Sequence, residues 1–212
     1  MEKYSVKKNQ KRSINKFWNK ALKESKPFAD RGYVVHDEIK LNSILFIGIN
    51  PSYNKKTSNC DNIFLNLNDD GTTESGKLFQ YFKKFPEISK YTGEQWGHLD
   101  LLMLRETNQS LIKKIYEKDF PFIKGQLDIS KKSIINSSPK VIVICNAFAC
   151  TLFSKHMFKL KFNETAGTHL ICNKSLEDTP VFFSSMLTGQ RALDLGSLER
   201  LKWHIKKVIN VS

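Results

Sequence analysis

The chain has 212 residues, and 34 lysines and arginines against 21 acidic residues give it a formal net charge of +13. At this length one domain is the default expectation, and 40% hydrophobic residues supply enough apolar side chains for a core, which excludes a wholly disordered chain. The longest apolar runs have strand length, well short of the roughly 18 residues of a membrane-spanning helix, so we expect no membrane partner.

The expectations about cellular compartment and cofactors rest on the cysteines and the N-terminal residues. The segment after Met1 lacks the apolar core of an export signal. Cys60, Cys145, Cys150 and Cys172 form no C-x-x-C pair. We therefore expect a cytoplasmic protein with reduced thiols and no iron–sulfur or zinc site. The five histidines do not have the sequence spacing to cysteine or aspartate that is typical of a metal site. We therefore predict neither a metal nor a cofactor.

Residues 1–27 are predicted to form a basic arm followed by a helix. The run Lys7–Arg12 is basic, and Ser13 is the predicted N-cap. The apolar residues after it have helical spacing: Ile14, Phe17, Trp18, Ala21 and Leu22. Pro27 disfavours helical geometry in the residue before it, so the helix should end near Lys26.

Four apolar runs farther along the chain are predicted to be buried strands: Ser43–Ile49, Leu99–Leu104, Val141–Cys145 and Val181–Phe183. A short strand at Leu170–Cys172 would pair with the last of them. Helical spacing occurs in Ser75–Phe82, Ile129–Ile135, Ala147–Phe153 and Leu198–Ile205. This alternation predicts one α/β domain over residues 1–212, with three layers (α/β/α) around a central, mainly parallel four-stranded sheet.

Ligands of parallel sheets bind at the carboxyl ends of the strands. Polar and small residues follow each predicted strand, in Gly48–Tyr53, Arg105–Gln109, Asn146–Phe148 and Ser184–Arg191. We expect the functional site to be built from these four segments.

The most informative segment is the strand that leads into Gly48-Ile49-Asn50-Pro51-Ser52. The glycine allows a ligand to approach the backbone, and the proline fixes the turn behind the asparagine. The amide of Asn50 can accept a hydrogen bond from water and donate through its NH₂. It is a poor general base, so it suits a reaction in which positioning a weak nucleophile is sufficient. The alternative is an ordinary Asx turn.

The Gly48–Ser52 segment resembles the first motif of the uracil-DNA glycosylase superfamily. It is closest to the mismatch-specific and single-strand-selective branches, which carry asparagine where the uracil-specific branch carries aspartate. Three further segments follow in the order of that superfamily: Trp96–Leu102, Lys140–Ala147 and Pro180–Leu187. The resemblance covers most of the chain after the N-terminal helix. It implies a monomeric, monofunctional DNA glycosylase of base-excision repair, which flips a uracil or another deaminated or damaged base and hydrolyses its N-glycosidic bond without a cofactor.

The resemblance also implies roles for individual residues. Asn50 would hold the attacking water, and Gly48, Ile49 and Tyr53 would border the base. Phe64 would stack on the base, with a core phenylalanine as the alternative. Asn108 would read the base edge.

The second motif departs from the family pattern. Ser184 and Ser185 stand where the family usually has a histidine, and a hydroxyl stabilises the departing base less than an imidazole does. Met186 or Leu187 would enter the duplex as an apolar wedge, with Gln190 beside it and Arg191 on a phosphate. The alternative for this loop is a plain surface turn. Arg105 would bind a phosphate or a carboxylate, or lie in a solvated turn.

Two other function classes remain open from the sequence. A relative that lost catalysis would still bind DNA or nucleotides. A hydrolase of a small substrate would carry its positive charge incidentally, as a lysine-rich surface that faces only solvent. DNA is the favoured partner, because each phosphate that a cationic side chain neutralises releases counterions.

Overall fold

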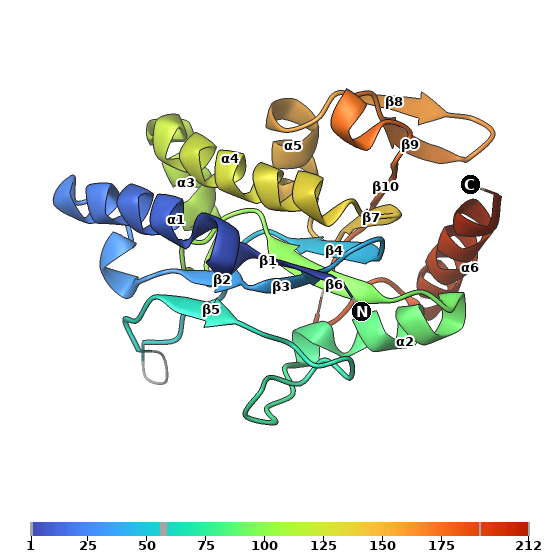
Figure 1. Cartoon of the computed structure of the whole chain (residues 1–212), viewed down its shortest axis with the longest axis horizontal. Helices are drawn as coiled ribbons and strands as arrows, with labels where there is room; N and C mark the ends of the chain where they lie inside the picture. Colours follow the sequence, from blue (N-terminus) through green and yellow to red (C-terminus); the bar gives the residue numbers. More distant parts are fainter. Residues whose placement is uncertain (1, 56–58, 191, 212) are drawn as a thin grey trace.

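The computed structural model describes residues 2–55, 59–190 and 192–211 of a mixed α/β chain (Figure 1). Its central sheet has the strand order β6-β4-β7-β10-β9-β8. The bounds are β4 Ile44–Gly48, β6 Trp96–Asp100, β7 Val141–Ile144, β8 Leu160–Asn163, β9 Thr168–Ile171 and β10 Pro180–Phe183. The first four strands in this order are parallel, and β9 is antiparallel to both its neighbours.

The mainly parallel sheet is therefore confirmed, but it has six strands where four were predicted. The additional strand that the sequence did not reveal is β8, which forms a hairpin with β9. Its residues are mostly exposed and include Lys161, so no apolar run marks it. The predicted pairing of a short strand near residue 170 with the last parallel strand is confirmed by the register of Leu170 opposite Pro180.

Two small sheets lie at the β6 edge of the central sheet. One pairs β1 Lys3–Ser5 with β3 Glu38–Lys40 in antiparallel fashion, and the other pairs β2 Val34–His36 with β5 Ile63–Leu65 in parallel fashion. Both β2 and β3 pack beside β6. The edge of the central sheet at β6 is thereby covered by chain from the N-terminal third of the molecule.

Helices lie on both sides of the central sheet. They are α1 Val6–Lys23, α2 Lys84–Thr92, α3 Gln109–Lys118, α4 Phe120–Ser137, α5 Ala147–His156 and α6 Leu195–Val211, with short 3-10 turns η1 Ala29–Arg31, η2 Gln80–Phe82 and η3 Lys174–Leu176. In Figure 1, α1, α4 and α5 lie above the strands, α2 lies below them and α6 stands at the right. Side chains of α2 and α6 share one core. Among the described residues, no helix is long and apolar enough to cross a membrane.

The strands β4 and β7 are apolar throughout because both of their faces are buried. Leu45 and Ile47 of β4 belong to one core, and Ile44 and Phe46 belong to another on the opposite face. Side chains alternate between the two faces of a strand, so each face contributes every second residue to its own core. This double burial explains why the continuous apolar runs predicted β4 and β7 correctly.

The first helix begins at Val6, seven residues before Ser13, the predicted N-cap. Its N-cap is Ser5, whose Oγ accepts a hydrogen bond from the Lys8 N–H at 3.0 Å and donates to Asp37 Oδ1 at 2.8 Å. The predicted cap at Ser13 is therefore wrong, and the basic run forms the first turns of the helix. The aspartate that supports the true cap comes from a distant segment, which local sequence cannot reveal.

The second parallel strand begins at Trp96 and ends at Asp100, so the predicted strand Leu99–Leu104 is misplaced. Residues 101–104 are buried without belonging to a strand. The Met103 and Leu104 N–H groups both donate to Gln126 Oε1 of α4, at 3.0 Å each. A side chain from another element thus accepts the hydrogen bonds of these buried backbone N–H groups. The apolar run there indicates burial and not a strand.

The predicted helix over residues 75–82 is also wrong, because only the η2 turn at its end is helical. Isolated bridges pair Leu67 with Thr73 and Thr72 with Leu78, so this stretch folds back on itself before α2 begins. Leu78 is exposed and Phe82 is buried, although helical spacing would place both on one face. The other predicted helices exist, and each is longer than its apolar spacing indicated.

Candidate functional site

The segments that follow the parallel strands are joined by hydrogen bonds at one edge of the sheet. The Asn50 amide, just after β4, donates through Nδ2 to the Pro51 carbonyl oxygen at 2.8 Å and to the Glu106 carbonyl oxygen beyond β6 at 2.6 Å. The Ser184 N–H, just after β10, donates to the Ile144 carbonyl oxygen of β7 at 2.9 Å. The segments after β4 and β6 are therefore bonded to each other, and the segment after β10 continues the hydrogen bonding with β7.

Asn50 is held by its NH₂ group and keeps its carbonyl oxygen available. A third, longer contact runs from Nδ2 to the Leu104 carbonyl oxygen at 3.4 Å. Within the described chain, Oδ1 has no hydrogen-bond partner. The backbone carbonyls distinguish the NH₂ from the oxygen and so set the orientation of the amide. An acceptor of fixed direction at the tip of β4 is suited to hold a water molecule.

The segment after β6 is braced from within. Arg105 is 5% exposed, and its Nη1 donates to the carbonyl oxygens of Arg31 and Asn59. The carboxylate beside it, Glu106, pairs with Arg31 at 2.7 Å. Burial acts to raise the pKa of Glu106, but hydrogen bonds from the backbone and from Arg31 outweigh it and lower the pKa. Arg105 therefore points into the protein and supports the loop that anchors Asn50.

Three of the predicted base-binding residues are engaged in packing or capping. Asn108 is the N-cap of α3, and its Oδ1 accepts from the Ser110 N–H at 3.0 Å. Phe64 lies edge-on to the ring of Tyr33, with centroids 5.7 Å apart, and packs against a core. Ile49 is 7% exposed and belongs to the same core. Of the three, Ile49 is buried, Phe64 is half-buried and Asn108 is exposed.

Tyr53 is half-buried at the start of the loop that follows Asn50. Its N–H donates to Thr107 Oγ1 at 3.1 Å, and that hydroxyl donates back to the Tyr53 carbonyl oxygen at 2.8 Å. The guanidinium groups of Arg31 and Arg105 lie 4.6 Å and 5.3 Å from its ring centroid. This ring therefore sits in a positively charged setting beside the strand ends.

The two serines of the second motif lie in different environments. The Oγ atom of Ser184 is buried and has no hydrogen-bond partner among the described residues. The side chain of Ser185 is exposed. A buried hydroxyl without a partner carries a desolvation cost, and such groups are uncommon in folded proteins. Of the two, only Ser184 has a buried hydroxyl without a partner among the described residues.

The loop after these serines contains the predicted wedge residues. Leu187 is 3% exposed and belongs to the core on the α2 and α6 face, so it does not project from the surface. Met186 is half-buried, and its carbonyl oxygen accepts from the Leu193 N–H at 2.9 Å. Gln190 is exposed. The prediction for Arg191 lies outside the described residues.

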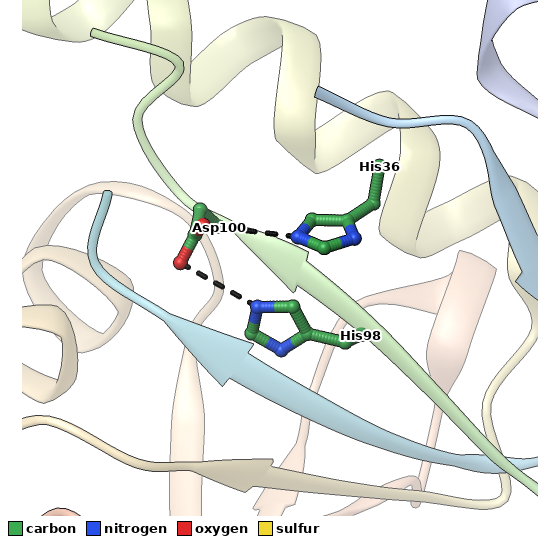
Figure 2. A group of neighbouring side chains, drawn as sticks. All are labelled: His36, His98 and Asp100. Atoms are coloured by element: carbon green, nitrogen blue, oxygen red, sulfur yellow. Dashed lines mark ion pairs between the residues drawn. The ribbon is translucent and has the colours of Figure 1, made fainter. Parts of the chain in front are cut away.

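Sequence reasoning missed a group of three polar side chains beneath this edge: His36, His98 and Asp100 (Figure 2). His98 and Asp100 alternate on β6, which places both on one face of the sheet. His36 comes from β2, and nothing in the local sequence pairs it with residues more than sixty positions later. The alternation of His98 and Asp100 was the feature that could have indicated this group. It was overlooked because the segment was interpreted as leading into a strand.

Both histidines of this group are buried. His36 is 5% and His98 2% exposed. Burial, with a smaller effect of the nearby His98, lowers the pKa of His36 well below its usual value. Burial likewise raises the pKa of the neighbouring Tyr81 hydroxyl well above its usual value. At neutral pH, the His36 ring is uncharged and the Tyr81 hydroxyl keeps its proton.

Two small cavities of about 20 Å³ each flank His36. Asp100 also lines one of them, and His98 lines the other. A volume of this size holds about one water molecule or ion. Asn50 lines neither of them. A nucleobase at the tip of β4 would therefore occupy a different place from these two cavities.

The chain was compared with protein-family models, with curated proteins and with solved structures, and none of the three comparisons gave a match.

Proposed function

We propose that this protein is a DNA glycosylase that removes uracil or another deaminated or damaged base, on a three-layer α/β/α scaffold. The observation that carries the proposal is the anchored amide of Asn50, whose NH₂ is fixed by the Pro51 and Glu106 carbonyls and whose oxygen is left to accept. The Gly-Ile-Asn-Pro-Ser turn and the net charge of +13 support it. The proposed partner is DNA, bound at the carboxyl ends of the parallel strands by a monomer in the cytoplasm.

In the proposed reaction, the bond between C1′ of the deoxyribose and the base nitrogen breaks, and its electron pair leaves with the base. A water molecule held by Asn50 Oδ1 forms the new bond to C1′, and the proton that it loses passes to the base or to solvent. An amide oxygen is a weak base, so the water attacks a sugar that already carries positive charge. The role of Asn50 is therefore to position the water.

Ser184 is the residue best suited to stabilise the departing base. Its buried hydroxyl donates to no described group, so it can donate to a base oxygen without first breaking a bond within the protein. A hydrogen bond made only as charge develops on the base lowers the barrier to its departure. One neutral hydroxyl supplies less stabilisation than an imidazole, so we expect slow turnover.

The test uses oligonucleotides that contain uracil, hypoxanthine or xanthine, in single and double strands. Abasic sites formed by the tag-free protein are cleaved with alkali, and strand scission is measured. We expect scission with at least one base, and a rate about 10²-fold lower in Asn50→Ala, because the water loses its acceptor. Asn19→Ala is the control, since Asn19 is an exposed asparagine on α1.

A second variant separates a catalytic role from a structural one. Asn50→Ala also removes hydrogen bonds that hold the loop, so its thermal midpoint is measured alongside. Ser184→Ala removes a hydroxyl without a partner, so it should leave the thermal midpoint unchanged or raised while lowering the scission rate about 10²-fold. Absence of scission with all three bases, together with salt-sensitive DNA binding, would instead identify a binding protein. Absence of both activities would favour a small-substrate hydrolase.

A further inference from the structure

The group of His36, His98 and Asp100 plays no part in the proposed glycosylase reaction. Each residue offers one ligand atom, and the three atoms lie within 4.8 Å of one another. His98 Nε2 is 3.6 Å from Asp100 Oδ1, and His36 Nε2 is 3.9 Å from Asp100 Oδ2. Figure 2 shows the carboxylate facing both imidazole rings. The three side chains therefore converge on a common point from two elements.

The hydrogen bonding of His98 determines which of its nitrogens presents a lone pair. Nδ1 lies 3.0 Å from the Phe46 carbonyl oxygen, which can only accept, so Nδ1 carries the hydrogen in the neutral ring. Nε2 is buried and has no hydrogen-bond partner among the described residues. Proteins orient metal-binding histidines in the same way, with one ring N–H on a carbonyl and the other nitrogen toward the ion.

His98 Nε2 faces Asp100 Oδ1 at 3.6 Å, which is farther than a hydrogen bond reaches. The His36 ring makes no hydrogen bond with the described part of the chain, and its Nε2 also faces the carboxylate, 3.9 Å from Oδ2. Buried polar groups are costly without a compensating partner. A cation between the three ligand atoms would supply that partner.

The spacing and chemistry of the donor atoms fit a divalent transition metal. Bonds of about 2.1 Å at tetrahedral angles place ligand atoms about 3.4 Å apart. The two distances to the Asp100 oxygens are 3.6 and 3.9 Å, and all three ligand atoms lie within 4.8 Å of one another, so side-chain rotations must bring them closer to close the site. Two imidazoles with one carboxylate favour Zn²⁺ and its neighbours in the first row, whereas Mg²⁺ and Ca²⁺ favour sites built from oxygen.

We propose that His36, His98 and Asp100 bind one divalent transition-metal ion, with Zn²⁺ as the reference ion, and that this ion fastens the β2–β5 sheet to β6. The two cavities that flank His36 give an ion a place to approach from either side. Lys3 and Lys40 line one cavity, and each is paired with an acidic side chain. Their positive charge is thus balanced beside the site.

The test titrates metal-free, tag-free protein with Zn²⁺ by calorimetry and with Co²⁺ by visible absorption. The background variant carries Cys60→Ser and Cys172→Ser, because these exposed thiols would otherwise bind metal. We expect one ion per chain, a Co²⁺ spectrum typical of nitrogen and oxygen ligands, and a thermal midpoint raised by Zn²⁺. His98→Ala and Asp100→Asn should each weaken Zn²⁺ binding by about 100-fold or more.

Asp100→Asn distinguishes a metal site from a simple ion pair. The asparagine has the shape of the aspartate without its charge, so we expect the metal-free variant to fold and to lose only the Zn²⁺-dependent rise. His169→Ala is the control, because His169 lies on β9 and contacts the rings of Phe162 and Phe183. Failure of the wild-type sites to bind Zn²⁺ or Co²⁺ stoichiometrically, or full binding in both variants, would overturn the proposal. Metal binding and the thermal midpoint are both measured without DNA, so this test is independent of the glycosylase test.

Discussion

Gly48 ends β4 at the point where two polar side chains approach the backbone. A Cβ atom at this position would lie 2.1 Å from Asp100 Oδ1 and 2.7 Å from the Tyr81 hydroxyl oxygen. The neighbouring ring of His98 would lie 3.2 Å away. The sequence indicated a close approach at this glycine but attributed it to a ligand. In the structure, the approaching groups are the protein's own side chains.

Gly48→Ala should destabilise the protein by about 1–3 kcal/mol, because Asp100 and Tyr81 must move to admit the methyl group. The measurement is the free energy of unfolding in urea. Gly196→Ala is the matched control, since Gly196 lies in the first turn of α6, where the nearest atom to a new Cβ is Asp194 Oδ1 at 3.3 Å. An equal effect of the two substitutions would contradict the steric explanation.

Local sequence identified Asn50 as a residue at the tip of a strand because a glycine and a proline bracket it. It did not identify the group of His36, His98 and Asp100, whose members meet only through the packing of β2 beside β6. Phe64 and Asn108 were predicted from residue types that suit base binding. The structure adds what local sequence did not show, that Phe64 packs against a core and Asn108 caps α3.

At the scale of elements, α1 depends on a cap that joins two parts of the chain. The Ser5 hydroxyl both caps the helix and donates to Asp37, which in turn accepts from the Lys7 N–H at 2.7 Å. A carboxylate at a helix N-terminus also interacts favourably with the helix dipole. Ser13 precedes the same apolar stripe but lies exposed inside the helix. Local pattern alone cannot distinguish these two serines, because the distinction comes from Asp37.

Ser5→Ala should lower the free energy of unfolding by about 1 kcal/mol, the usual effect of losing a cap. Ser13→Ala should change it by less than about 0.5 kcal/mol, because alanine is a good helix former at an exposed site. Urea unfolding of the two variants measures both values. A larger loss for Ser13→Ala than for Ser5→Ala would argue against the observed start of α1.

At the scale of the whole molecule, part of the positive charge lies on the exposed side of α1. Among the described residues, the exposed cations of the first turns of α1 form no ion pair: Lys7, Lys8, Lys11, Arg12 and Lys16. Exposed charges of one sign raise the local potential and attract polyanions. Composition alone predicts that the protein attracts polyanions. The placement of these basic residues on α1 could be predicted only with the correct position of the N-terminus of that helix.

DNA binding should therefore weaken steeply with salt. If the protein neutralises three phosphates, its affinity for duplex DNA should fall about 40-fold between 50 and 200 mM salt, because counterions are released on binding. Fluorescence anisotropy with a labelled duplex measures the change, and the thermal midpoint over the same range controls for unfolding. An affinity independent of salt would count against DNA as the partner.

The sequence predicted the parallel part of the sheet because strands buried on both faces are apolar throughout, as in β4 and β7. It placed β6 too late, since His98 and Asp100 interrupt the apolar pattern there. It did not predict β8, whose residues are mostly exposed at the far edge. Strands were thus predicted correctly where both faces are buried. They were misplaced or missed where one face carries polar residues or is open to solvent.

The last strand along the chain, β10, lies between β7 and β9 in the sheet. The β8–β9 hairpin is therefore synthesised before the strand that connects it to the rest of the sheet. On the ribosome, β4, β6 and β7 can assemble first, while the hairpin has no neighbour to dock against until residue 183 has left the exit tunnel. Insertion of β10 is then the step that unites the two halves, and a nascent chain stalled before that point would expose an unpaired strand on each side of the gap.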